Sequence, residues 1–313
     1  MDDRIARIQV KLAALPPAEE AVLGPVLTEQ QVSAFEELHG TRMPEEFRQF
    51  VTHIGHGGYG PTYGLLSMER WVSGAGGVNG NLAEPFPFVP DMHIAERSAG
   101  RRGGAAPTFA GAIAVVYRGC SDFTLLVVTG PGRGRLVEVN SEGFFTPHFH
   151  TDPDFLAWYE RWLDFTLAGH RDLTWFADQM AGDEAALVAT LLNSELATRR
   201  RAAAYTFITY PAPSASLPNV LTQALSTEPH PAVRETILRA LSAQGEHGRD
   251  RLTTALADPV PGVRSLAANL MTTNTPQGRQ LCPQLRHTLG NHLRAEKDRS
   301  VRDTIQRLLD HSH

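Results

Sequence analysis

Residues 228–234 read Glu-Pro-His-Pro-Ala-Val-Arg, and residues 258–264 read Asp-Pro-Val-Pro-Gly-Val-Arg. Both segments follow the pattern acid-Pro-x-Pro-small-Val-Arg, which recurs after 30 residues. A weaker copy spans residues 298–302, and we expect a degenerate fourth copy over residues 191–210. Leucine-rich helical segments flank the copies. An internal repeat of this period built from paired helices is typical of a solenoid.

The repeat places an arginine at the end of each copy, at Arg234, Arg264 and Arg302. We expect a structural role, in which each side-chain stem packs and each guanidinium group meets an acid of the next repeat. A basic ladder open to a partner is the alternative. The arginine run 199–201 is interpreted as a solvated helix face.

The segment that precedes the helical repeats in the sequence is predicted to contain strands. Residues 111–117 (GAIAVVY) and 124–130 (TLLVVTG) are typical strand sequences, and the turn GPGRGR leads into LVEV at 136–139. This order predicts an antiparallel meander.

Helices are predicted on both sides of these strands. One spans residues 3–15, a second runs from a Thr28 cap with a Gln31 partner to Gly40, and a third begins at Pro44. A fourth begins near Asp154, and its aromatic residues recur at helical spacing, which favours core packing over a ligand box; they are Phe155, Trp158, Trp162 and Phe165.

Length and charge suggest two domains, which we place at 1–170 and 171–313. Residues 1–169 hold 13 basic and 20 acidic residues, whereas residues 170–313 hold 16 and 14. An acidic N-terminal half argues against nucleic-acid binding and suits a basic protein partner. Two distant cysteines, no leader sequence and no apolar run of membrane-spanning length predict a cytoplasmic location.

The segment Met-Pro-Glu-Glu-Phe-Arg-Gln-Phe at 43–50, followed by Gly-Gly-Tyr-Gly-Pro at 57–61, resembles the SMI1/KNR4 (SUKH) family. The strand at 111–115 and the helix at 155–163 also fit that family, so the resemblance covers about residues 25–168. The Pro-x-Val-Arg copies resemble HEAT repeats. The expected fold class is an α+β SUKH-like domain, with an antiparallel sheet flanked by helices, plus an all-α HEAT-like C-terminal domain.

The SUKH resemblance implies a bacterial immunity-type protein that binds and neutralises a toxin domain, often a nuclease, and it implies no enzyme activity. Together with the acidic charge of the N-terminal half, it makes a basic nuclease-type toxin the expected partner. The HEAT resemblance implies a protein-binding scaffold or regulator, which is the alternative function. The candidate partner-binding residues are acids and aromatic residues in or near the glycine-rich loop: Glu45, Glu46, Tyr59, Tyr63, Glu69, Trp71 and Glu84.

Catalytic patterns are weak. His148 and His150, joined by His53, His56 or His93, form the only basis for a metal-enzyme hypothesis, and no acid or cysteine lies at convincing ligand spacing. Residues 130–135 lack the Gly-Lys-Ser/Thr ending and the helix of a phosphate loop. Cys120 is expected to be a small buried residue rather than a nucleophile. We expect no metal and no cofactor.

Overall fold

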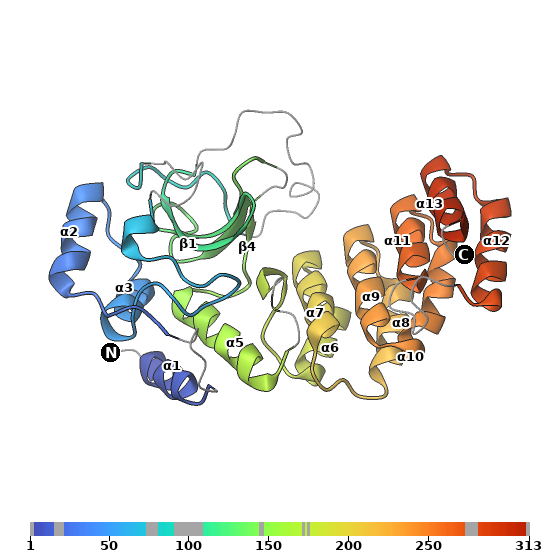
Figure 1. Cartoon of the computed structure of the whole chain (residues 1–313), viewed down its shortest axis with the longest axis horizontal. Helices are drawn as coiled ribbons and strands as arrows, with labels where there is room; N and C mark the ends of the chain where they lie inside the picture. Colours follow the sequence, from blue (N-terminus) through green and yellow to red (C-terminus); the bar gives the residue numbers. More distant parts are fainter. Residues whose placement is uncertain are drawn as a thin grey trace. The chain divides into compact units, whose positions relative to one another are not determined.

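The computed structural model describes residues 3–15, 22–72, 81–90, 109–143, 147–170, 173, 176–272 and 281–310. The chain divides into two compact units, Met1–Ala181 and Gly182–His313. The first is mixed α/β and the second is helical (Figure 1). No helix in the described ranges combines the length and the apolar character needed to cross a bilayer.

The first unit contains a four-stranded antiparallel sheet in the order β1-β2-β3-β4. The predicted meander is confirmed, with Leu125 of the second strand facing Val137 of the third across the predicted turn. The short last strand was not predicted. The strands are β1 (Ala112–Gly119), β2 (Asp122–Val127), β3 (Leu136–Asn140) and β4 (His148–Phe149).

The helices of this unit begin and end near the predicted residues. Thr28 and Gln31 form a reciprocal capping box, and Gly40 closes its helix in a left-handed conformation at φ 59°. Helices α1 (Asp3–Ala13), α3 (Glu45–His53) and α5 (Phe155–Ala168) contact one another and lie on one side of the sheet (Figure 1). The bounds are α1 (Asp3–Ala13), α2 (Glu29–His39), α3 (Glu45–His53) and α5 (Phe155–Ala168), with short 3-10 turns η1 (Met68–Arg70) and η2 (Phe176–Asp178).

Aromatic rings join α3 to α5. The ring of Phe155 lies 4.8 Å from that of Phe47 and 4.9 Å from that of Phe50, both at edge-to-face angles. Such pairs add to the stability that burial provides. The four aromatic residues of α5 that were predicted to be core are all buried.

The first unit extends beyond the predicted boundary at 170/171. The guanidinium of Arg161 lies 3.7 Å from the ring centroid of Phe176, and the hydroxyl of Thr151 donates to the carbonyl of Gln179. These contacts hold the segment after α5 on the first unit. The division therefore falls after Ala181, because contacts set it, whereas the sequence analysis followed the loss of strand patterns.

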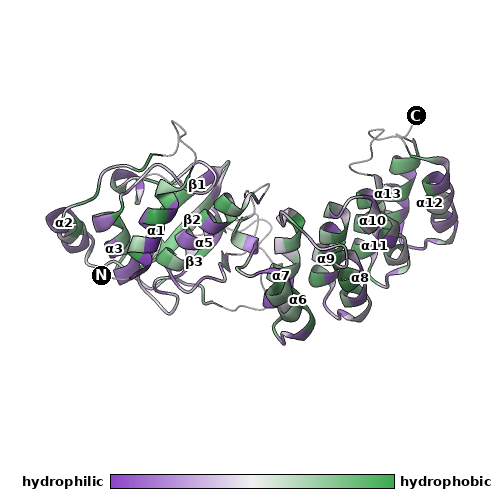
Figure 2. Ribbon diagram, turned by 90° about the horizontal axis from the view of Figure 1, so that it is seen from below, coloured by the Kyte–Doolittle hydropathy of each residue, from purple (hydrophilic) through white to green (hydrophobic). Residues whose placement is uncertain are grey.

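The second unit consists of successive helix pairs whose second members carry the repeat motif. Their packing contacts link neighbouring pairs. In Figure 2 the outer helix α12 shows much hydrophilic colour, whereas the strands of the first unit are coloured hydrophobic. The helices are α6 (Glu184–Asn193), α7 (Ala197–Thr209), α8 (Leu217–Thr227), α9 (Pro231–Ala243), α10 (Glu246–Arg249), η3 (Asp250–Ala257), α11 (Pro261–Thr272), α12 (Pro283–Ala295) and α13 (Arg299–Asp310).

One ion pair recurs between neighbouring helix pairs. Arg234 Nε lies 3.0 Å from Asp258, and Arg264 Nε lies 2.7 Å from Glu296, so the predicted contact with an acid of the next repeat is confirmed for both. Arg200, in the degenerate copy, pairs with Glu228 at 2.7 Å. Each arginine also donates from Nη1 to two carbonyls that precede its own helix.

We refer to these recurring arginine–acid pairs as the ladder. The acid that each repeat contributes lies six residues before the arginine of the same repeat. In the last copy that acid is Glu296, while Asp298 instead accepts from the backbone N–H of Val301 at 3.1 Å and caps α13. Arg302 is exposed and has no carboxylate partner among the described residues.

Replacing Glu228 by glutamine should destabilise the helical unit by about 2 kcal/mol, because a hydrogen bond to a charged, largely buried group is lost while Arg200 keeps its charge. Urea unfolding followed by circular dichroism measures the change.

Glu195→Gln is the matched control, since Glu195 is exposed, and it should shift stability by less than about 0.5 kcal/mol. Equal effects of the two substitutions would contradict a stabilising ladder.

Candidate protein-binding surface

The glycine-rich loop, residues 55–66, extends the sheet beyond the outer edge of β1. Leu65 bridges to Val116 of β1, Gly58 bridges to Leu65, and Leu23 bridges to Gly58. The N–H of Gly58 donates to the carbonyl of Leu65 at 2.9 Å. The loop is therefore held by backbone hydrogen bonds, and it covers an edge that would otherwise be open.

Two glycines are required by close approach of the backbone. Gly58 has φ 90°, and a Cβ there would lie 2.2 Å from the carbonyl oxygen of Val22. Gly64 has φ 88°, and its Cβ would lie 2.3 Å from the carbonyl oxygen of Gly58. A Cβ at either position would clash with the facing backbone, so close packing explains these glycines.

The two tyrosines of the loop have different surroundings. Tyr59 packs its ring edge-to-face on Trp162 at 4.8 Å, and its carbonyl accepts from the hydroxyl of Tyr159 at 2.9 Å. Tyr63 is 73% exposed and stacks on Tyr117 at 5.9 Å. Tyr59 therefore attaches the loop to α5, whereas Tyr63 is an exposed aromatic residue whose ring stacks on that of Tyr117.

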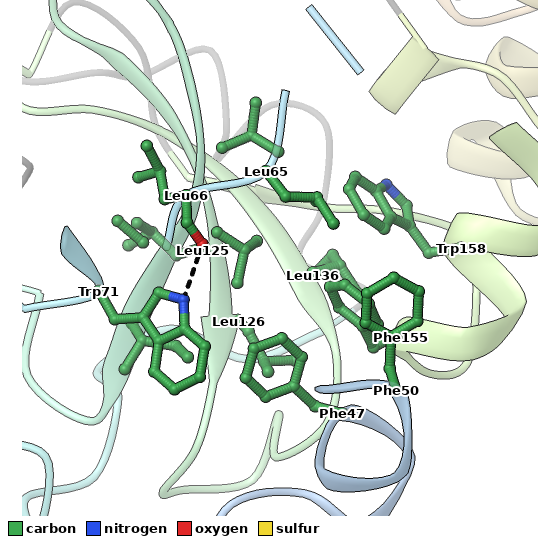
Figure 3. Close-up of a cluster of buried hydrophobic side chains, with 14 of the residues drawn as sticks. Phe47, Phe50, Leu65, Leu66, Trp71, Leu125, Leu126, Leu136, Phe155 and Trp158 are labelled. Carbon is green, nitrogen blue, oxygen red and sulfur yellow. Dashed lines mark hydrogen bonds between the residues drawn. The ribbon is translucent and has the colours of Figure 1, made fainter. Parts of the chain in front are cut away.

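Trp71 is a core residue, so its prediction as a partner-binding residue is corrected. It is 1% exposed, its indole N–H donates to the carbonyl of Leu66 at 3.0 Å, and its ring lies 5.0 Å from that of Phe47 (Figure 3). The side chain fills the space between the loop and α3, where no partner can reach it. A sequence cannot distinguish this burial from exposure, because tryptophan is common in both places.

A small cavity lies beneath the loop among apolar side chains of α3, α5 and β1. Its volume is about 10 Å³, at the lower limit for one water molecule. It therefore offers no room for an organic ligand.

Residues with positive φ lie near the stacked pair of exposed Tyr63 and half-buried Tyr117. Thr62 has φ 57° and Cys120 has φ 48°, the two positive values outside glycine in the described part of the chain. Tyr117 donates its hydroxyl to the carbonyl of Cys120 at 3.2 Å. The Cys120 thiol is exposed, which corrects the expected burial, because the tight β1–β2 turn directs it outward. Strain of this kind concentrates at functional sites.

Three of the four predicted acids surround the α2–α3 connection. Glu45 and Glu46 lie in the first turn of α3, where carboxylates also favour the helix dipole. Exposed Glu84 follows Ala83, whose Cβ lies 3.9 Å from the Cβ position of Gly40. Glu69 lies on η1, directly before Arg70 and Trp71, and not on α3.

The histidines bind protein groups. His150 Nε2 lies 2.8 Å from Glu138, and the ring is 1% exposed. His56 Nδ1 contacts the carbonyl of Pro25 at 2.7 Å, and His53 Nδ1 contacts that of Gln49 at 3.0 Å. Within the described ranges no three metal-ligating side chains gather, and His93 lies outside those ranges.

Glu138 is the centre of a buried charge network that the sequence analysis missed. It contacts Arg118, His150 and the hydroxyl of Thr124, the last at 2.8 Å. Burial alone would raise the pKa of its carboxyl group, but Arg118 and His150 outweigh burial and lower the pKa to about 2. The only sequence signal is an acid inside the apolar strand LVEV.

Glu138→Gln should cost about 3 kcal/mol or more at neutral pH, because Arg118 is left buried without its counter-charge. The lowered pKa means that the carboxylate stabilises the fold above about pH 4.5 and loses this effect as the pH falls toward about 2. The stability difference from the parent protein should therefore shrink across this window in denaturant titrations.

The exposed acid Glu37 on α2 supplies the control, since Glu37→Gln should leave stability within about 0.5 kcal/mol. A difference for Glu138→Gln that is independent of pH would contradict the charge network.

No family model matches this chain, and comparisons with curated proteins and with solved structures likewise gave no match. The family resemblances remain predictions that rest on the quoted motifs.

Proposed function

We propose that this chain is a non-enzymatic, protein-binding protein of the immunity type, in which a SUKH-like unit binds and neutralises a basic toxin domain. The observation that carries the proposal is the exposed Tyr63, stacked on Tyr117 and flanked by strained backbone. A rigid, exposed aromatic residue is the kind of side chain that dominates binding energy at protein interfaces.

Charge supports a basic partner. The first 169 residues carry seven more acidic than basic residues, and exposed Glu45 and Glu84 and half-buried Glu46 lie near the α2–α3 connection. Complementary charge speeds association and orients the encounter. Arg42 is also exposed there, so the patch is acidic on balance and not uniformly so.

The HEAT-like interpretation of the second unit belongs to the same proposal. Its support is the recurring helix pair and the arginine–acid ladder. Because three of the ladder arginines are already paired within the chain, a partner of this unit would have to bind other residues. The alternative function, a scaffold or regulator, is favoured by this separate compact unit, which a minimal toxin inhibitor does not need.

Co-expression with a toxin-like domain encoded beside this chain's gene tests the proposal through host survival. The parent protein should rescue growth. Reversing both charges, Glu45→Lys with Glu46→Lys, should slow association about tenfold and weaken rescue, most clearly at low salt in binding assays with purified proteins.

Glu195→Lys reverses a charge on the second unit and should leave rescue unchanged. Cell death in the presence of the parent protein, with no complex on mixing, would count against immunity and favour the scaffold.

Tyr63 and Tyr59 provide a matched pair of substitutions. Tyr63→Ala should reduce toxin affinity about 30-fold while leaving stability nearly unchanged, because the ring is mostly exposed. Tyr59→Ala should instead lower the unfolding temperature, because its ring packs on Trp162. Calorimetry of binding and thermal unfolding separate the two effects, and unchanged affinity for Tyr63→Ala would exclude this surface.

A further inference from the structure

Two arginines of the ladder hold the carboxylate of the next repeat with two nitrogens each. Arg264 donates from Nε and Nη2 to the two oxygens of Glu296, at 2.7 and 2.8 Å. Arg200 donates in the same way to Glu228, at 2.7 and 2.9 Å. Paired hydrogen bonds of this kind are strong and fix the orientation of both groups. They define what an arginine at this position of a repeat binds.

Arg302 holds the same position in the last copy of the motif. It follows Val301, which is fully buried, as are Val233 and Val263 of the two preceding copies. The Arg302 side chain is exposed, and no carboxylate within the described ranges pairs with it. Helix α13 therefore presents to solvent a donor group that an acid occupies in the preceding repeats.

The helix pair α12 and α13 is basic. Residues 283–310 carry six basic and four acidic residues. Two of these acids are used within the chain, since Glu296 pairs with the preceding arginine of the ladder and Asp298 caps α13. Arg299 lies one turn before Arg302 on the same side of the helix, and its side chain is 96% exposed. The surroundings of Arg302 thus favour a negatively charged occupant.

The outer side of α13 is polar, which argues against a further helix pair as that occupant. In the three preceding repeats, the residue four positions after the arginine is apolar and buried, as Ala204, Leu238 and Ala268 show. In α13 this position holds Gln306, which is exposed. Terminal repeats of solenoids have such a polar outer face. An occupant of Arg302 therefore binds through charge and hydrogen bonds.

A second copy of this chain lacks the acid that Arg302 requires. In each regular repeat the acid lies six residues before the arginine, but in the degenerate copy Ser194 holds that place. The acids of the other repeats, Glu228, Asp258 and Glu296, are paired within the chain. Stacking of α6 and α7 from a second copy on α13 would thus place a hydroxyl group opposite the guanidinium.

We propose that the side of α13 that carries Arg299, Arg302 and Gln306, defined here as the ladder end, binds an acidic segment of another protein. A carboxylate of that segment accepts hydrogen bonds from Nε and Nη2 of Arg302, as Glu296 does from Arg264. The ladder end belongs to the second unit. The proposal therefore does not rest on the immunity role of the first unit.

A labelled peptide of ten glutamates is the probe, titrated into the full chain at about 50 mM NaCl, where screening is weak. Arg302→Glu should weaken its binding at least about tenfold, because the variant repels the carboxylates. Arg302→Lys keeps the charge but removes the two-nitrogen fork, so it should weaken binding about fivefold. Equal affinities of the lysine variant and the parent protein, or no binding to the parent protein, would overturn the proposal.

Arg199→Glu and Arg199→Lys are the matched controls, since Arg199 is exposed on α7 directly before Arg200. Both should change the affinity by less than about twofold, and all four variants should keep the unfolding temperature of the parent protein, because surface substitutions cost little stability. Effects at Arg199 equal to those at Arg302 would reduce the binding to general charge attraction and overturn the proposal. NMR shift changes spread beyond α12 and α13 would do the same.

Sedimentation of the protein without peptide tests the second copy as the occupant. The parent protein and Arg302→Glu should sediment as the same species. A larger species of the parent protein that the substitution dissociates would identify a second copy at the ladder end and overturn the proposal.

Discussion

The packing of Phe155 against α3 is the interaction on which the first unit depends. Its ring touches Phe47 and Phe50 of α3, and Phe47 in turn touches Trp71. The indole of Trp71 holds the carbonyl of Leu66, which ends the glycine-rich loop. Trp71 thus connects the end of the loop to the aromatic core, while backbone hydrogen bonds hold the loop at the edge of β1.

The second unit depends on a simpler constraint, which recurs along its helix pairs. The valine of each motif is buried, and in two motifs the arginine beside it pairs with the acid of the following repeat, as in Val233 with Arg234 and Val263 with Arg264. The apolar contact supplies burial, and the ion pair with its carbonyl contacts fixes the spacing between helix pairs. The number of residues between successive motifs can vary, because each arginine pairs with the acid that lies six residues before the arginine of the following motif.

Two carboxylates of the first unit, Glu138 and Glu160, have different electrostatic surroundings. Glu138 is buried and fully enclosed by partners, so its charge orders the end of the sheet. On Glu160, burial alone would raise the pKa, but Arg7 and Lys11 lower it; the Arg7 side chain is 53% exposed, whereas that of Glu160 is 12% exposed. Salt should screen this second network more than the first, because Arg118 and Glu138 are both buried.

Local patterns determined much of this protein from the sequence alone. The Thr28 capping box, the Gly40 cap, the aromatic face of α5 and the repeat arginines were all predictable, since each depends on residues close in the chain or on a strict period. Tertiary structure decided whether Trp71 is buried and Tyr63 exposed, which acid pairs with Arg264, and that Glu138 meets Arg118 and His150. These outcomes depend on which distant segments come into contact, and neither hydropathy nor spacing encodes that choice.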